Sequence, residues 1–206
     1  MIPAPVTWLL IGITCVVSWL AFNNPKLAER LILWPPAIER NRQYDRLLTC
    51  GFIHADFSHL LFNMVTLFFF GGQIEDVMNT LSGSRLTYPA FYLAALVVSI
   101  LPSYFKNQKN ARYYSLGASG AVSAILFAFI LLAPWSLIIV MVIPVPAILY
   151  ALFYVGYSIW MDRQGGDNIN HSAHLAGAAF GVIFMVAMNP RVLQHFWQAL
   201  LQPRFF

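Results

Sequence analysis

The chain has 206 residues, of which 59% are hydrophobic and only 10% are charged, and its formal net charge is +4. A water-soluble domain with this ratio would expose large apolar patches, so the composition excludes an ordinary soluble enzyme and indicates a membrane protein. The Lys and Arg residues lie between apolar runs, which indicates anchors at a membrane surface and not a nucleic-acid-binding patch. The length fits one domain over residues 1–206.

Six apolar runs, each long enough for a membrane-spanning helix, follow one another along the chain. No basic segment precedes the first run and no small-residue cleavage site follows it, so we expect a span and not a cleavable signal peptide. Residues 133–135 join the fourth and fifth runs, which predicts a tight helical hairpin, and Pro144 and Pro146 are expected to bend or loosen the fifth helix. The expected spans are residues 4–22, 57–79, 87–105, 116–133, 136–159 and 171–189.

Two segments outside these runs are expected to lie in the membrane interface, namely residues 23–56 and the tail 190–206. The distribution of Lys and Arg argues against a cytoplasmic N-terminus. If the N-terminus is cytoplasmic, most basic residues fall on the opposite side, whereas the positive-inside rule favours the reverse topology. The cytoplasmic side would then hold Arg85, Arg191 and Arg204, and the other side Lys26, Arg30, Arg40, Arg42, Arg46, Lys106, Lys109, Arg112 and Arg163.

Strongly polar side chains gather at the starts of the second, fourth and sixth spans. Such groups are costly inside a bilayer, so each one is a candidate functional residue. These three spans run in the same direction, and their starts therefore lie on one side of the membrane. We expect the polar groups to converge just below that surface. The candidates are His54, His59 and Asn63 around the start of the second span, Ser119 at the start of the fourth, and His171 and His174 at the start of the sixth.

Small residues on the fourth and sixth spans predict that these two helices pack closely. Gly120 begins a stripe of small residues at every fourth position, and Gly177 and Gly181 form a GxxxG pair on the face of His174. A close contact would bring Ser119 toward His174. A hydroxyl beside an imidazole is the arrangement that a serine nucleophile needs.

An oxyanion site is expected beside this pair. Ser119 opens its helix, where backbone N–H groups have no partner within the helix and carry a positive partial charge. His59 and Asn63 are spaced i, i+4, so they share one helix face and can add side-chain donors.

Each of these features also has a structural explanation. Small residues commonly pack membrane helices, and a lone intramembrane histidine often holds helices together or carries protons. Two other functions therefore stay open: a binding or chaperone module for membrane helices, and a small transporter that uses His59, Asn63 and His174. A proton pathway would want a carboxylate, and Glu75 and Asp76 lie at the far end of their span.

At these positions the sequence resembles the rhomboid intramembrane serine proteases, most strongly over residues 44–189. The order and spacing of three motifs match together, which is more specific than any one of them. The matching residues are His54, His59 and Asn63 for the pattern HxxxxHxxxN, Gly117, Ser119 and Gly120 for GxSG, His174, Gly177 and Gly181 for HxxGxxxG, and, more weakly, Arg46, Gly71, Gly72 and Glu75.

This resemblance implies an all-α membrane protein with a six-transmembrane-helix rhomboid-like bundle. It implies Ser119 as nucleophile, His174 as general base, and His59 and Asn63 in the oxyanion hole. The fifth helix would be the mobile wall that admits a substrate helix. Helix packing at the site would involve Gly117, Gly120, Gly177 and Gly181.

The resemblance also implies transmembrane-protein substrates and a lipid bilayer as partners, and no nucleic acid; the oligomeric state stays open. A bacterial inner membrane is expected, with the active site toward the extracytoplasmic side. No cofactor or metal is expected, because the histidines lack a tight HExxH-type arrangement. Asp162 and Asp167 are expected to be solvated loop residues.

Three positions depart from the family pattern. Asp45 replaces the aromatic residue that usually precedes Arg46, and Asn79 replaces a common glycine. Ser123 stands one turn after Ser119, where an aromatic residue often packs on the catalytic histidine. We therefore expect His174 to be less firmly oriented.

Overall fold

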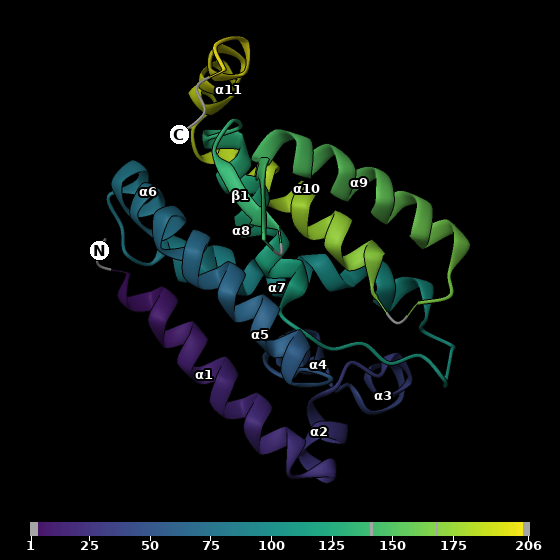
Figure 1. Ribbon diagram of the computed structural model, residues 1–206. Coiled ribbons are helices and arrows are strands. Elements are labelled where there is room, and N and C mark those ends of the chain that lie inside the picture. Colours follow the sequence, from purple (N-terminus) through teal and green to yellow (C-terminus); the bar gives the residue numbers. More distant parts are fainter. Residues whose placement is uncertain (1–3, 141, 168, 204–206) are drawn as a thin grey trace.

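The computed structural model describes residues 4–140, 142–167 and 169–203, so Arg204 of the orientation prediction and the last two residues of the predicted interfacial tail lie outside it. Most of the described chain is helical. Helices α8 (Ser119–Leu132) and α10 (His171–Met188) run through the middle, with α1 (Pro5–Phe22) and α9 (Ala147–Gln164) on opposite outer sides (Figure 1).

Helix α1 matches the first predicted span, and a buried carboxylate holds its N-terminus. Glu75 accepts hydrogen bonds from the backbone N–H groups of Val6 (3.0 Å) and Thr7 (2.8 Å) and from the Thr7 hydroxyl (2.7 Å). The first N–H groups of a helix lack partners within it, and Pro5 at the first position has none to satisfy. Glu75 thus completes the start of α1 from another helix, at the end of the molecule away from residues 107–118.

The connection after α1 folds into short helical turns. They are α2 (Pro25–Leu31), α3 (Pro35–Asn41), α4 (Arg46–Thr49) and the 3₁₀ turn η1 (Cys50–Phe52). Buried Arg46 ties this connection together, because its guanidinium donates to the carbonyl oxygens of Glu29 and Ile32, each at 2.7 Å. Asp45, the departure next to it, pairs with Arg30 at 2.7 Å.

The second predicted span is one continuous helical segment that ends later than expected. It consists of α5 (Phe57–Thr66), the π-helical turn η2 (Leu67–Gly71) and α6 (Gly72–Ser82). Asp56 caps its start by accepting from the His59 N–H at 2.8 Å, and Gly83, in the left-handed conformation, ends it. Helix α7 (Thr87–Lys106) follows and agrees with the third predicted span.

Helix α8 forms the centre of the bundle, and eleven of its fourteen residues are buried. Its contact with α10 leaves no room for side chains. A Cβ atom on Gly177 would lie 2.0 Å from the Gly120 carbonyl oxygen, and one on Gly181 would lie 2.1 Å from the Ala124 carbonyl oxygen. The two backbones therefore touch directly, as small-residue faces allow.

The fifth predicted span is wrong over its first half, and the tight helical hairpin expected at residues 133–135 is absent from the described residues. A β-hairpin of β1 (Leu137–Val140) and β2 (Ile143–Pro146) precedes α9, which begins only at Ala147. The register pairs Pro144 with Ile139 and Pro146 with Leu137. In the next pair outward, the Ala147 N–H donates to the Ser136 carbonyl oxygen. Hydrogen-bonded and non-hydrogen-bonded pairs alternate along an antiparallel ladder, so both prolines lie in non-hydrogen-bonded pairs, where the ladder needs no N–H.

The physical reason for this error lies in the residue types. A run of Ile and Val residues with prolines two apart has the period of a strand, and we interpreted it as a bent helix. The tail forms α11 (Arg191–Leu201). In the described part of the chain, four helical segments are long and apolar enough to cross a membrane: Pro5–Phe22, Phe57–Ser82, Thr87–Lys106 and His171–Met188. The protein is therefore a mostly helical, multi-pass membrane protein.

Candidate active site

Ser119 and His174 meet at the contact between α8 and α10. The Ser119 Oγ lies 2.8 Å from the His174 Nε2, a hydrogen-bonding distance. Ser119 is the first residue of α8, and His174 lies one turn into α10. Because Gly177 sits one turn after His174 against the Gly120 carbonyl, the backbone contact of the two helices sets this distance.

The turn before Ser119 requires glycine at position 117. Gly117 has φ 117°, a conformation that other residues rarely adopt. A Cβ atom there would also lie 2.7 Å from the His59 imidazole. The Gly117 N–H donates to the Cys50 carbonyl oxygen at 2.8 Å. The turn is thus held against the loop that leads into α5.

His54 holds the residue between Gly117 and Ser119. Its Nε2 accepts from the Ala118 N–H at 3.3 Å, so its proton is on Nδ1, which lies 2.9 Å from the Ser18 hydroxyl of α1. Ser18 in turn donates to the Phe52 carbonyl oxygen. His54 precedes the spanning helix, and burial lowers its pKa to about 3, so it stays neutral. It links α1 to the turn that presents Ser119.

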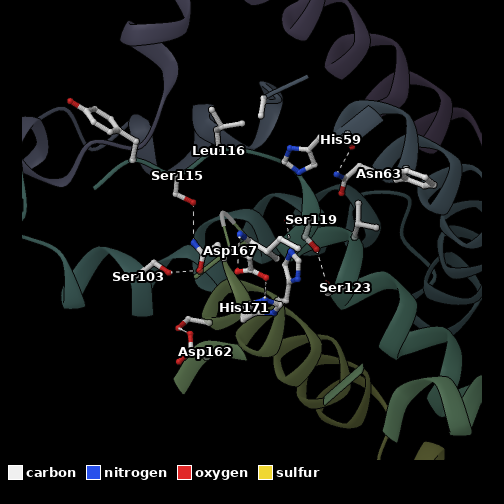
Figure 2. A pocket seen from close by; sticks show the side chains of 18 of the residues that line it. His59, Asn63, Ser103, Ser115, Leu116, Ser119, Ser123, Asp162, Asp167 and His171 are labelled. Atoms are coloured by element: carbon white, nitrogen blue, oxygen red, sulfur yellow. Dashed lines mark hydrogen bonds and ion pairs between the residues drawn. The ribbon is translucent and has the colours of Figure 1, made fainter. Parts of the chain in front are cut away.

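His59 and Asn63 line the same cavity as Ser119 (Figure 2). The cavity has a volume of about 1000 Å³. The Asn63 amide donates one hydrogen bond to the His59 carbonyl oxygen at 2.8 Å. An amide group carries two N–H donors, so a second one remains to serve the cavity. The His59 ring is fixed between Gly117 and the His54 ring, whose centroid is 4.9 Å away.

Asn170 holds the start of α10 in place. Its side-chain oxygen accepts from the Ala173 N–H (3.0 Å) and from the Ser103 hydroxyl of α7 (2.8 Å). Its amide donates to Tyr113 (3.0 Å) and Ser115 (2.9 Å), both in the loop before α8. One N-cap residue thereby connects α7, the loop and the helix that carries His174.

The two nearby carboxylates have partners other than His174. Asp167 accepts from the His171 Nε2 at 3.0 Å, and this hydrogen bond holds the pKa of the Asp167 carboxyl below its usual value. Asp162 accepts from the Ser172 hydroxyl at 2.6 Å. Both residues are exposed, as predicted, but Asp162 lies in α9 and not in a loop. Each also bonds a residue of the first turn of α10. His171 is the first residue of this helix.

Comparisons with known proteins identify the family of this chain. A family model described as a rhomboid domain matches residues 41–191. The chain belongs to the rhomboid family. RHOMBOID-like protein 12, mitochondrial, of Arabidopsis thaliana is 33% identical over 181 residues, which cover 81% of this chain and 53% of the plant protein.

Two further rhomboid relatives come from an animal and a bacterium. The presenilin-associated rhomboid-like protein, mitochondrial, of Mus musculus is 30% identical over 148 residues, covering 68% of this chain and 37% of the mouse protein. The putative rhomboid protease YdcA of Bacillus subtilis (strain 168) is 23% identical over 191 residues, covering 87% and 86% of the two chains. This rhomboid chain thus spans about half the length of the plant relative and 37% of the mouse one.

Two residues at this rhomboid site were missed from sequence. Asn170 gave one usable signal, because an asparagine directly before an apolar helix is a typical N-cap. Tyr154 of α9, whose ring stacks on His174, gave none that sequence spacing can reveal. Among the residues that the structure describes, no group of three or more His, Cys, Asp or Glu side chains is arranged to hold a metal ion.

Proposed function

We propose that this chain is an intramembrane serine endopeptidase. The observation that carries the proposal is the 2.8 Å distance between the Ser119 Oγ and the His174 Nε2 at the wall of a cavity large enough for a peptide segment. Membership of the rhomboid family, in which the Bacillus subtilis relative is named as a rhomboid protease, supports it.

In the proposed reaction, His174 takes the Ser119 proton while the Ser119 oxygen attacks the carbonyl carbon of a peptide bond. The resulting oxyanion is stabilised by the Ser119 N–H at the start of α8 and by donors on His59 and Asn63. When the tetrahedral intermediate collapses, the C–N bond breaks and His174 gives its proton to the departing amine. Water, deprotonated by His174, then attacks the acyl ester and restores Ser119.

We propose transmembrane segments as the substrates. The cavity wall combines the dyad with apolar groups on three helices, including Phe62 of α5, Leu126 of α8 and Tyr150 of α9. A substrate helix could therefore enter sideways between α5 and α9 without leaving the lipid. In this proposal six segments cross the membrane, with α8 and α9 added to the four long apolar ones.

A reporter transmembrane segment tests the catalytic assignment. Purified wild type should cleave it, whereas Ser119→Ala and His174→Ala should be slower by at least about a thousandfold while retaining the wild-type melting temperature. Undiminished cleavage by Ser119→Ala would end the protease proposal. A rhomboid-fold binding module would instead retain the segment in all three proteins without cutting it.

Asn63→Ala tests the oxyanion assignment separately. Loss of one oxyanion donor typically costs about a hundredfold in rate, so kcat should fall by about that factor with KM little changed. Thr66→Ala, one turn along the same cavity wall, is the matched control and should stay within about threefold, because its hydroxyl already bonds the Phe62 carbonyl oxygen. Equal rates for both variants would remove Asn63 from the mechanism.

We further propose that the site faces the extracytoplasmic side of a bacterial inner membrane. Single cysteines at Gln108 and Gln164 report on this, because Gln108 lies just after the C-terminal end of α7 and Gln164 ends α9, both at the site end of the bundle. A membrane-impermeant thiol reagent added to intact cells should label both in a background lacking Cys15 and Cys50. Labelling only after the cells are opened would support the reverse topology that the positive-inside rule favours.

A further inference from the structure

The aromatic ring that packs on His174 comes from α9. The Tyr154 and His174 rings are nearly parallel, with an interplanar angle of 21° and centroids 6.0 Å apart. This separation lies within the range of offset-stacked aromatic pairs. Ser123, one turn after Ser119 on α8, is too small to provide such a ring, so α9 carries the group that α8 lacks.

A hydrogen bond to Ser123 fixes the position of Tyr154. The Tyr154 hydroxyl lies 2.6 Å from the Ser123 Oγ. The single proton of Ser123 is directed to the Ser119 carbonyl oxygen at 2.8 Å, so Tyr154 is the donor and Ser123 the acceptor. Phe127 and Tyr150 flank the tyrosine ring, with centroids 5.5 and 5.7 Å away. Tyr154 is therefore bonded to the residue that stands one turn from the nucleophile.

His174 depends on ring packing for its orientation. In serine enzymes with three-membered sites, a carboxylate holds the imidazole in place. Within the described residues, three carboxylates line the cavity, and each has another partner: Asp56 accepts from the His59 N–H, Asp162 from Ser172 and Asp167 from His171. The His171 ring meets His174 only edge-on, at 76°. Tyr154 is the neighbour that lies along the imidazole plane and can restrain its rotation.

We propose that Tyr154 is a positioning residue that keeps the His174 Nε2 directed at Ser119. This inference rests on the proposed function. Because α9 carries the ring, the base is held only while α9 is packed against α8. That packing is slight: the buried residues of α9 are Ala147, Ala151 and Ser158. A displacement of α9 that admits substrate breaks the bond to Ser123 and unstacks the ring, so the base is fully oriented only after α9 returns.

Two variants separate the ring from its hydroxyl. Tyr154→Leu removes the ring and should lower kcat for the reporter segment by about 10- to 100-fold with KM little changed, because small misplacements of a reacting group have effects of this size. Tyr154→Phe keeps the ring and should lose only about two- to fivefold. Phe153→Leu is the matched control, since this side chain on the same helix is 71% exposed, and it should behave as wild type.

A rescue distinguishes positioning from general stability. Adding Ser123→Phe to Tyr154→Leu moves the ring from α9 to α8 and should recover at least part of kcat. Loss of activity that follows the melting temperature in all variants, with no rescue, would overturn the positioning role. The rate at which a fluorophosphonate labels Ser119 should follow the same order, because this reaction needs the oriented base but no peptide.

These readouts keep the two proposals apart. If wild type is labelled at Ser119 and cleaves the reporter segment, and Tyr154→Leu is labelled and cleaves equally fast, the positioning role is lost and the protease proposal stands. If Ser119 is labelled at a Tyr154-dependent rate but no segment is cut, the endopeptidase proposal is lost and the positioning role stands. If Ser119 neither reacts nor supports cleavage in wild type, both are lost.

Discussion

The two helices that flank the site, α10 and α9, are held in different ways. Helix α10 contacts α8 backbone to backbone, with Gly177 against the Gly120 carbonyl and Gly181 against the Ala124 carbonyl. Helix α9 places no glycine against a neighbouring backbone: its one glycine, Gly156, is exposed and has nothing within 4 Å of a Cβ position. Many large side chains of α9 face outward, including Leu152, Phe153 and Trp160, which are more than half exposed.

This difference separates two requirements of the proposed chemistry. The distance between nucleophile and base must be constant, and a direct backbone contact can hardly change without separating the helices. Access for a substrate helix requires an element that can move, and a helix held by a few side chains can do so at low cost. The chain therefore places the reacting pair on the tight side of the site, where α10 contacts α8. The movable wall of the cavity is on the loose side, formed by α9 and the β-hairpin before it.

The largest expected effect breaks the tight contact. In Gly177→Ala the new methyl group would lie 2.0 Å from the Gly120 carbonyl oxygen, so the helices must separate. Overpacking of this kind destabilises by about 1–3 kcal/mol, and we expect a melting temperature lower by about 5–10 °C. Because the separation also moves His174 away from Ser119, cleavage should fall by at least about a hundredfold.

Gly156→Ala is the matched control on the loose side. It makes the same chemical change in a helix of the same length, at a position with open space. Alanine is favoured over glycine in helices by up to about 1 kcal/mol in soluble hosts, so the melting temperature should stay equal or rise slightly. If both variants lost stability to the same degree, the contrast between α9 and α10 would be wrong.

The second prediction concerns the turn before Ser119, which belongs to the tight side. Gly117→Ala places a side chain at φ 117° and 2.7 Å from the His59 ring. Strain of this type costs about 1–3 kcal/mol, and the methyl group must also push His59 out of the cavity wall. We expect kcat to fall by about 10- to 100-fold and the melting temperature by only a few degrees. Gly83→Ala, also at positive φ but with open space, should cost stability alone.

The tight side was also the side that could be predicted from sequence. Co-directional spans place Ser119 and His174 at a similar depth in the membrane. Small residues on both helices are a local pattern that predicts close packing. Both signals need only the period of a helix and the direction of the chain. The resemblance to rhomboid proteases added the roles of His59 and Asn63, whose placement beside Ser119 no spacing rule alone would give.

The loose side was predicted poorly, and the reasons are physical. The apolar residues of the run 136–159 suit a bent helix as well as a strand with alternating prolines. The sequence therefore predicts one span there, whereas the register shows strand pairing in its first half. Tyr154 acts through a contact with residues 20 or more positions away, and its role depends on the absence of an aromatic residue at Ser123. Contacts of this type depend on how the helices are rotated about their axes, which composition does not specify.

The smallest effect expected at neutral pH concerns the attachment of the Ser119 turn to α1. His54 accepts from the Ala118 N–H and donates toward Ser18, and burial lowers its pKa from 6.5 to about 3. Between these two values the unfolded chain binds one more proton at this site than the folded chain. Stability from this site therefore falls as the pH is lowered from about 6.5 toward 3, by up to about 1.4 kcal/mol per pH unit.

His54→Gln isolates the contribution of His54 protonation to stability, because the glutamine amide offers an acceptor and a donor but does not titrate. At pH 7 the variant should melt a few degrees below wild type, and the gap should narrow or reverse toward pH 4. His195→Gln, a change of an exposed histidine on α11, should leave the pH dependence as in wild type. Parallel curves for His54→Gln and wild type would mean that His54 is not held neutral by burial. The bond from Ala118 to His54 would then not be what fastens the Ser119 turn to α1.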